Sequence, residues 1–210
     1  MSNAPAAASP RLVPAHRPDL CLEFADTLYW RGSEPPTESL HGIDDVLAWC
    51  RSTDTLDEPS ESRLRTWWGA RPNVAGHAFA DVLAMRETIH SVFAAVAVGG
   101  PAPADALARL GRALAAAPAR VDLAMSGGVY AWRLPDAEPS PASLLTPVLW
   151  SAGDLLVGPR LDRVRRCANA KCQWLFLDDS KGGTRRWCAM SSCGNRAKAH
   201  RHAARKKAEG

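Results

Sequence analysis

The stretch CANAKCQWLFLDDSKGGTRRWCAMSSCGNRAKAHRHAARKK, residues 167–207, decides the fold of the C-terminal part of the chain. It holds Cys167, Cys172, Cys188 and Cys193, spaced as C-x4-C, fifteen residues, then C-x4-C. Two short cysteine pairs separated by a hairpin-sized insert are the pattern that a tetrahedral four-cysteine Zn²⁺ site requires. Because protein sulfurs fill all four positions, the pattern predicts a closed, structural zinc site rather than a catalytic one.

The insert and the segment after the last cysteine predict the shape of this unit. Trp174 and Phe176 alternate with leucines, residues 178–183 are dense in turn formers, and Trp187 leads back to the second pair. These features predict a hairpin between two cysteine knuckles, residues 167–172 and 188–193, with the aromatic side chains packed beside the metal. The second knuckle runs into a sequence of helical propensity, which is the layout of a treble-clef-like finger.

Charge is divided unevenly along the chain. Residues 160–210 carry fourteen Lys or Arg and four Asp or Glu, a net +10, whereas residues 1–159 carry twelve and eighteen, a net −6. A basic C-terminal quarter on an acidic body is typical of a polyanion-binding module. The candidate nucleic-acid contacts are Arg185, Arg186, Arg196, Lys198, Arg201, Arg205 and Lys206.

The rest of the chain predicts a mainly helical domain with a β-hairpin, so the fold class expected is α+β. Apolar spacing and turn residues predict helices over residues 18–31, 43–50, 60–69, 77–98, 104–116 and 140–157. The last helix has two possible starts, because Thr146-Pro147 offers the same signal as Ser140-Pro141. Residues 18–31 also fit a strand. Two alternating runs around Gly127 and Gly128 predict a hairpin over residues 120–134. The domains expected are a flexible lead at 1–15, a helical domain at 16–158 and the finger at 160–208.

Several classes of protein are disfavoured by what the sequence lacks. It has no Gly-rich phosphate loop, no G-x-S-x-G and no H-E-x-x-H, so no enzyme is predicted. Cys21 and Cys50 stand singly in apolar contexts, which indicates buried thiols. No secretory signal is evident, and the longest apolar run, residues 92–98, is far short of the roughly 20 residues that span a bilayer. We therefore expect a soluble protein of the reducing cytoplasm.

At the finger the sequence resembles the CGNR zinc-finger family. The matching residues are Cys167, Cys172, Trp174 to Asp178, Ser180, Arg185 to Cys188, Met190, Cys193 to Arg196, Lys198 and Arg201. LCLEFADTL, residues 20–28, is similar to the start of the ABATE domain, except that Asp26 stands where that family usually has Asn. The resemblance implies a bacterial, stress-induced transcription regulator in which an ABATE domain precedes the finger. It implies Zn²⁺ and suggests DNA.

Four functions remain open on the sequence. The first is a DNA-binding transcription regulator whose helical body senses an effector or forms a homodimer. The second is an RNA-binding module, in which Trp174 and Trp187 stack on bases if they are exposed. The third is a protein-interaction adaptor with a purely structural zinc, and the fourth is a redox switch.

Overall fold

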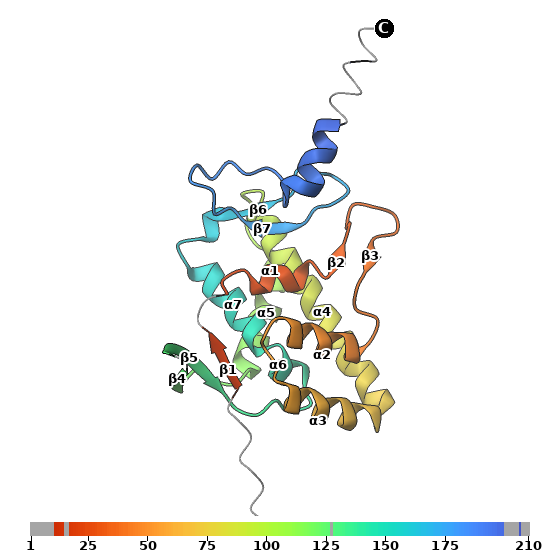
Figure 1. Cartoon of the computed structure of the whole chain (residues 1–210), viewed down its shortest axis with the longest axis vertical. Coiled ribbons are helices and arrows are strands. Elements are labelled where there is room, and N and C mark those ends of the chain that lie inside the picture. Colours follow the sequence, from red (N-terminus) through yellow and green to blue (C-terminus); the bar gives the residue numbers. More distant parts are fainter. Residues whose placement is uncertain (1–10, 15–16, 127, 200–205, 207–210) are drawn as a thin grey trace, which may run out of the picture.

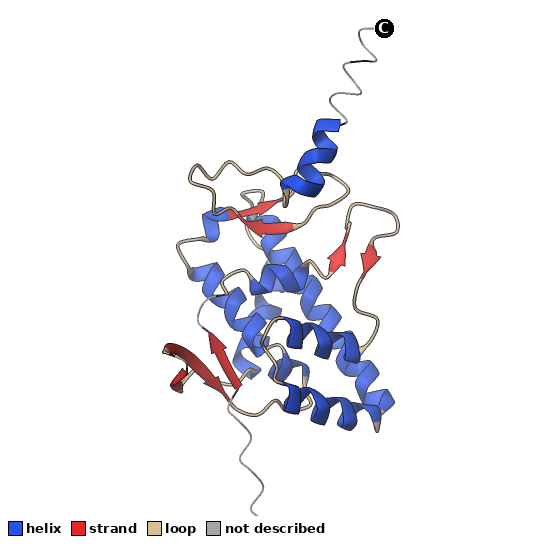
Figure 2. Ribbon diagram, viewed as in Figure 1, coloured by secondary structure: helices blue, strands red, loops and turns tan. Residues whose placement is uncertain are grey.

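The computed structural model describes residues 11–14, 17–126, 128–199 and 206. A bundle of helices forms the body, three small antiparallel sheets lie at its periphery, and the finger caps one end (Figures 1 and 2). The α+β, mainly helical class expected from the sequence is confirmed. No helix in the described part of the chain is both long and apolar enough to cross a bilayer.

The first four helices are α1 (Leu20–Ala25), α2 (Ile43–Ser52), α3 (Glu58–Gly69) and α4 (Pro72–Val96). Helix α1 is shorter than the helix predicted over residues 18–31, because the chain leaves it at Asp26 and enters strand β2 (Leu28–Tyr29). Helix α4 contacts each of the other three and begins five residues before the predicted start. Pro72 explains the difference. A proline can follow the end of one helix, but it is equally suited to the first position of the next, and here it begins α4.

The later helices are α5 (Ala104–Ala116), α6 (Pro141–Leu144) and α7 (Thr146–Val157). Helix α5 has the predicted bounds. The helix predicted over residues 140–157 is divided at Leu145, because two start signals stand close together. Ser140 caps α6 by accepting a hydrogen bond from the backbone N–H of Ser143, and Pro147 lies in the first turn of α7.

The largest sheet has the strand order β1 (Arg11–Pro14), β5 (Val129–Leu134), β4 (Leu123–Ser126). The β4–β5 hairpin is the one predicted from the sequence. Strand β1 lies in the predicted flexible lead, yet it pairs along the free edge of β5, where unpaired backbone groups are available. A second sheet joins β2 to β3 (Thr37–Glu38).

The finger begins with a short 3₁₀ turn, Leu161–Arg163, followed by β6 (Val164–Arg166) and β7 (Leu175–Leu177). A π-helical turn, Met190–Gly194, leads into helical residues 195–199. The predicted pairing within the insert is wrong. Strand β7 pairs antiparallel with β6, across the first cysteine pair, and residues 184–187 form no strand.

Alternation along β7 explains this pairing. Leu175 and Leu177 belong to the hydrophobic core of the helical body, together with Val164 of β6, whereas Phe176 packs with the cysteines. The β6–β7 hairpin therefore lies against α1 and α4 and completes their core (Figure 1). Cys21 and Cys50 are fully buried in the same core, as predicted.

Candidate metal centre

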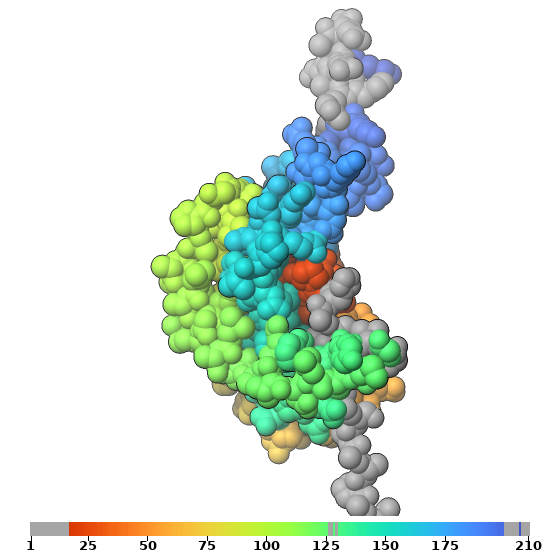
Figure 3. All heavy atoms as spheres, turned by 90° about the vertical axis from the view of Figure 1, so that its left-hand side faces the viewer, coloured from red at the N-terminus to blue at the C-terminus, as the bar shows by residue number. Residues whose placement is uncertain are grey.

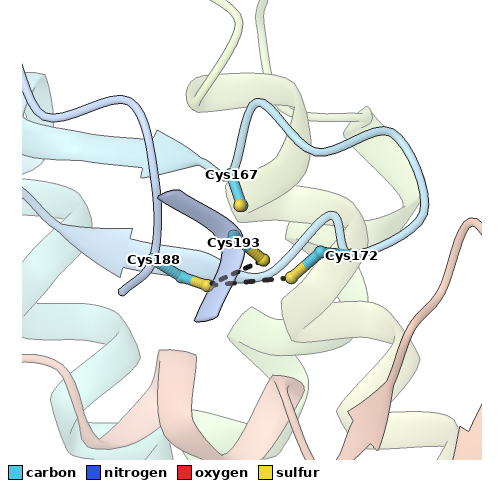
Figure 4. Close-up of side chains that lie close together, drawn as sticks. All are labelled: Cys167, Cys172, Cys188 and Cys193. Atoms are coloured by element: carbon cyan, nitrogen blue, oxygen red, sulfur yellow. Dashed lines mark hydrogen bonds between the residues drawn. The ribbon is translucent and has the colours of Figure 1, made fainter. Parts of the chain in front are cut away.

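Four cysteine side chains from separate parts of the finger converge on one point (Figure 4). Cys167 follows β6 directly, Cys172 ends the first knuckle, Cys188 precedes the π-helical turn and Cys193 lies within it. Their Sγ atoms all lie within 4.8 Å of one another. Cys188 is half-buried and the other three are buried, so the cluster is largely shielded from water.

The spacing of the sulfurs fits a tetrahedral metal site. The Sγ of Cys188 lies 3.7 Å from that of Cys172 and 3.8 Å from that of Cys193. A tetrahedron with Zn–S bonds of about 2.3 Å has S–S edges of about 3.8 Å. The residues present therefore match the size and the donor chemistry of a four-thiolate zinc site.

The thiols of the cluster influence one another's pKa. Hydrogen bonding with Cys172, and with Cys167 and Cys193, lowers the pKa of Cys188 to about 5. Hydrogen bonding with Cys188 raises the pKa of Cys172, and burial raises the pKa of Cys167 to about 11. A bound Zn²⁺ holds its cysteine ligands as thiolates, so metal binding at such a cluster displaces thiol protons.

Asn169 organises the first knuckle, and the sequence analysis did not single it out. Its side-chain oxygen accepts from the backbone N–H of Lys171 at 3.1 Å, and its carbonyl accepts from that of Cys172 at 2.9 Å. Its amide nitrogen donates to the Sγ of Cys193 at 3.4 Å, which links the two knuckles. The available signal was an asparagine two residues after a ligand-type cysteine, a position that favours such a side-chain turn.

Asp178 holds the long turn that leads to the second knuckle. Its buried carboxylate accepts from the hydroxyl and the backbone N–H of Ser180, and from the backbone N–H of Arg185 at 2.8 Å. The hydrogen bond from the Ser180 hydroxyl lowers the pKa of Asp178. Gly183 adopts a φ of +61°, which glycine tolerates without steric cost. The acid-rich turn is thus a structural element of the finger.

The candidate nucleic-acid residues have different environments. Arg185 donates to the carbonyls of Trp187 and Cys188 and lies over the Phe176 ring, so it supports the second knuckle. Arg186 lies over Trp187 and remains exposed. The remaining described candidates, all exposed, are Arg196, Lys198 and Lys206. Arg201 and Arg205 lie outside the described residues.

Aromatic side chains surround the cysteines. Trp174 and Trp187, predicted to pack beside the metal, pack against the cysteines and remain half-buried. A third, Trp30, comes from the segment after β2 in the body. The sequence analysis missed Trp30 because nothing near it in the chain points to a metal site.

Two contacts attach the first knuckle to the body. The backbone N–H of Leu175 donates to Oδ1 of Asp26 at 3.0 Å, and that of Gly32 donates to the carbonyl of Lys171 at 3.1 Å. A Cβ at Gly32 would lie 1.9 Å from the carbonyl oxygen of Ala170. The backbone of the knuckle is therefore in direct contact with the loop that carries Trp30.

Comparison with protein families agrees with this division. The family model named ABATE, described as "Putative stress-induced transcription regulator", matches residues 18–159, more than half of the chain. The chain belongs to the ABATE family. A second model, the CGNR zinc finger, matches residues 163–206 and includes the whole cysteine cluster. The resemblance stated from the sequence is confirmed.

The ABATE and CGNR matches also set the general class of the protein. They describe a regulator domain and a metal-binding zinc finger, and neither describes an enzyme. No curated protein matches the chain.

Proposed function

We propose that this chain is a transcription regulator that binds duplex DNA through its finger, which Zn²⁺ stabilises on Cys167, Cys172, Cys188 and Cys193. The observation that carries the proposal is the cysteine cluster, because it fixes the start of a basic helix, residues 195–199 (Figure 1), in the part of the finger that protrudes from one end of the body (Figure 3). In this proposal residues 16–158 form the ABATE body and residues 160–208 the finger, after a lead at residues 1–15.

The charge of the finger supports this role. Residues 160–199 carry ten Lys or Arg and three Asp or Glu. Four thiolates and one Zn²⁺ would contribute −2, which leaves the finger strongly positive. Arg196 and Lys198 are exposed on the helix, and neither forms a salt bridge within the described residues. Such cations suit contacts with phosphates.

The test is a titration of labelled duplex DNA by fluorescence anisotropy at two salt concentrations. With roughly three or four phosphate contacts, the affinity should fall about 40- to 150-fold between about 50 and 200 mM salt, because each contact releases condensed counterions. The Lys198→Gln variant should bind more weakly, with a salt slope smaller by about 1.

Arg112→Gln is the matched control, because Arg112 is an exposed cation on helix α5 of the body. It should leave both affinity and slope unchanged. Failure of the intact, zinc-loaded protein to bind duplex DNA at low salt would exclude the proposal. Affinity that is equal in the wild-type protein and a Lys198→Glu variant would favour the protein-interaction adaptor.

RNA binding remains the second candidate, supported by the half-buried aromatic side chains beside the finger. It predicts that single-stranded RNA displaces duplex DNA in competition. Duplex DNA is favoured here because Arg186 and Lys198 are exposed, whereas Trp174 and Trp187 are only partly exposed.

The ABATE body is proposed to sense an effector or to dimerise, and the protein is proposed to act in the cytoplasm without enzymatic activity. Sedimentation of the full chain at several concentrations tests dimerisation directly.

A further inference from the structure

Two cavities lie where the body meets the finger, and Trp30 lines both of them. The first, of about 420 Å³, is lined by Trp30, Trp187, Lys171 and Arg196 among others. The second, of about 320 Å³, is lined by aromatic residues, Tyr29, Trp30 and Trp174, and by cysteines of the cluster. Both include Trp30 and Cys193, and we refer to them together as the Trp30 groove. Their size lies in the range of small-molecule sites.

Trp30 is held in the groove by an unusual backbone conformation. Its φ is +52°, in the left-handed region that bulky residues rarely adopt. Its carbonyl accepts from the backbone N–H of Ser33 at 2.7 Å, and the neighbouring Gly32 is bonded to the first knuckle. Backbone strain of this kind persists only where surrounding contacts fix it, and it is frequent at binding sites.

The walls of the groove favour a planar ring. The rings of Tyr29 and Trp174 lie 5.2 Å apart between centroids, and Trp30 and Trp187 are half-buried beside them. These four side chains come from two parts of the chain, residues 29–30 and 174–187. Ring stacking between such faces is stabilising and needs few hydrogen bonds.

The charge of the groove favours an anion. The guanidinium of Arg196 lies 4.5 Å over the Trp30 ring, and neither Arg196 nor Lys171 has a carboxylate partner in the described part of the chain. No acidic residue occurs among the described residues that line either cavity. An anionic group placed in the first cavity would meet both cations, whereas Cys172 and Cys188, which belong to the site of charge −2 in the zinc-loaded protein, line the second cavity.

We propose that the Trp30 groove binds a small planar aromatic carboxylate, with its ring against Trp30 and its carboxylate paired with Arg196. A nucleobase fits less well, because the side chain of Asn169, the amide of the first cavity, is already committed to Lys171 and Cys193. Few groups remain to read the edge of a base. If the finger binds DNA as proposed above, the same ligand engages Arg196 and thereby weakens the complex.

The experiment is isothermal titration of the zinc-loaded full chain, without DNA, with naphthoate and with its neutral analogue naphthamide. Naphthoate should bind saturably, and naphthamide at least tenfold more weakly, because it cannot form the charge-assisted pair. Arg196→Gln should weaken naphthoate binding at least tenfold, and Trp30→Leu should abolish it. Trp30→Tyr, which retains a ring, should preserve part of the affinity.

The matched control is the Arg71–Trp67 pair on the body, whose guanidinium also lies 4.5 Å from the ring. Arg71→Gln and Trp67→Leu should leave naphthoate binding unchanged. Circular dichroism and zinc content verify that each variant is folded. A subsequent anisotropy titration with duplex DNA, with and without naphthoate, tests the coupling separately, so absence of DNA binding leaves the ligand result intact.

Three outcomes would overturn the proposal. The first is absence of saturable binding by naphthoate at millimolar concentrations. The second is equal affinity for the acid and the amide. The third is displacement of naphthoate by a single-stranded oligonucleotide that binds far more tightly than naphthoate and whose binding is lost in Trp30→Leu. The aromatic walls of the groove would then serve to stack on bases.

Discussion

Asp26 contributes one of the hydrogen bonds between body and finger. Its carboxyl is buried, Oδ1 accepts from Leu175, and Oδ2 has no hydrogen-bond partner among the described residues. Burial raises the pKa of Asp26 well above its usual range, although the backbone hydrogen bond and Arg31 partly oppose the shift. The folded state therefore retains a proton that the unfolded chain loses at a pH of about 4.

The first prediction concerns Asp26→Asn. Above the unfolded pKa the folded protein binds more protons than the unfolded chain, so its free energy of unfolding falls as pH rises toward the folded pKa. Asparagine keeps an oxygen that accepts the hydrogen bond, and it has no carboxyl group that ionises on unfolding. Asp26→Asn should therefore be more stable than the wild-type protein at neutral pH. The difference should shrink toward pH 4, as measured by urea denaturation across pH.

Asp26→Ala is the companion variant. It leaves the buried N–H of Leu175 without an acceptor and should be about 1–3 kcal/mol less stable than Asp26→Asn. Equal stability of the two variants would contradict a role for this hydrogen bond.

Arg86 gives the second prediction at this scale. It is 3% exposed, and its terminal nitrogens donate to Glu38 at 2.6 and 2.7 Å. Burial opposes the charge of Glu38, but the bonds from Arg86 outweigh it and lower the pKa of Glu38. Glu38→Gln should destabilise the protein by about 3 kcal/mol, near the lower end for a broken buried pair because Glu87 still pairs with Arg86.

Denaturant unfolding at neutral pH measures this loss. Asp136→Asn is the control, since Asp136 is an exposed acid of the body and should change stability by less than about 0.5 kcal/mol. A similar effect of the two substitutions would show that the Arg86–Glu38 pair contributes nothing.

Among the elements, β7 connects two clusters that are separate in the sequence. Leu175 is 1% exposed and lies in the core of the helical body. Leu175→Ala should destabilise the protein by about 2–5 kcal/mol, since it leaves a cavity in that core. Calorimetry should still show one transition. Val157→Ala, at an exposed apolar position of α7, should have little effect. Independent melting of the finger in Leu175→Ala would contradict a shared core.

The elements also show what the sequence could predict. In α2, Ile43, Val46, Leu47 and Cys50 follow a helical period, and all four are buried as that period requires. The cysteine cluster was predictable for a similar reason, because two short pairs must each present two sulfurs. Local pattern and local chemistry decide both features.

Features that depend on distant partners could not be predicted. The pairing of β7 with β6 follows from the body core that accepts Leu175 and Leu177, which the insert itself does not reveal. Strand β1 forms because β5 has a free edge. Trp30 and Asn169 belong to the candidate site because the first knuckle packs against the body. No residue spacing in the sequence indicates this packing.

At the scale of the whole molecule, metal removal should affect body and finger together. Metal binding supplies folding free energy in small cysteine sites, and here the hairpin that encloses the site also closes the helical core. Chelation should therefore lower the Tm of the entire chain, by about 2–4 °C for each 1 kcal/mol lost. Amide hydrogen exchange within α2 and α3, which hold no residue of the finger, reports the body separately.

Restoring Zn²⁺ should restore the Tm, and Cys167→Ser should reproduce the effect of chelation. An unchanged signal from the body after the metal is removed would mean that the two parts unfold independently.

The two faces of β7 also limit which finger and body sequences can be combined during evolution. Phe176 must suit the cysteines while its neighbours Leu175 and Leu177 must suit helices α1 and α4. A finger moved from one ABATE protein to another would bring three side chains selected for a different core. Recombination at the boundary near residue 160 should therefore yield folded hybrids only when the facing residues of the body travel with the hairpin.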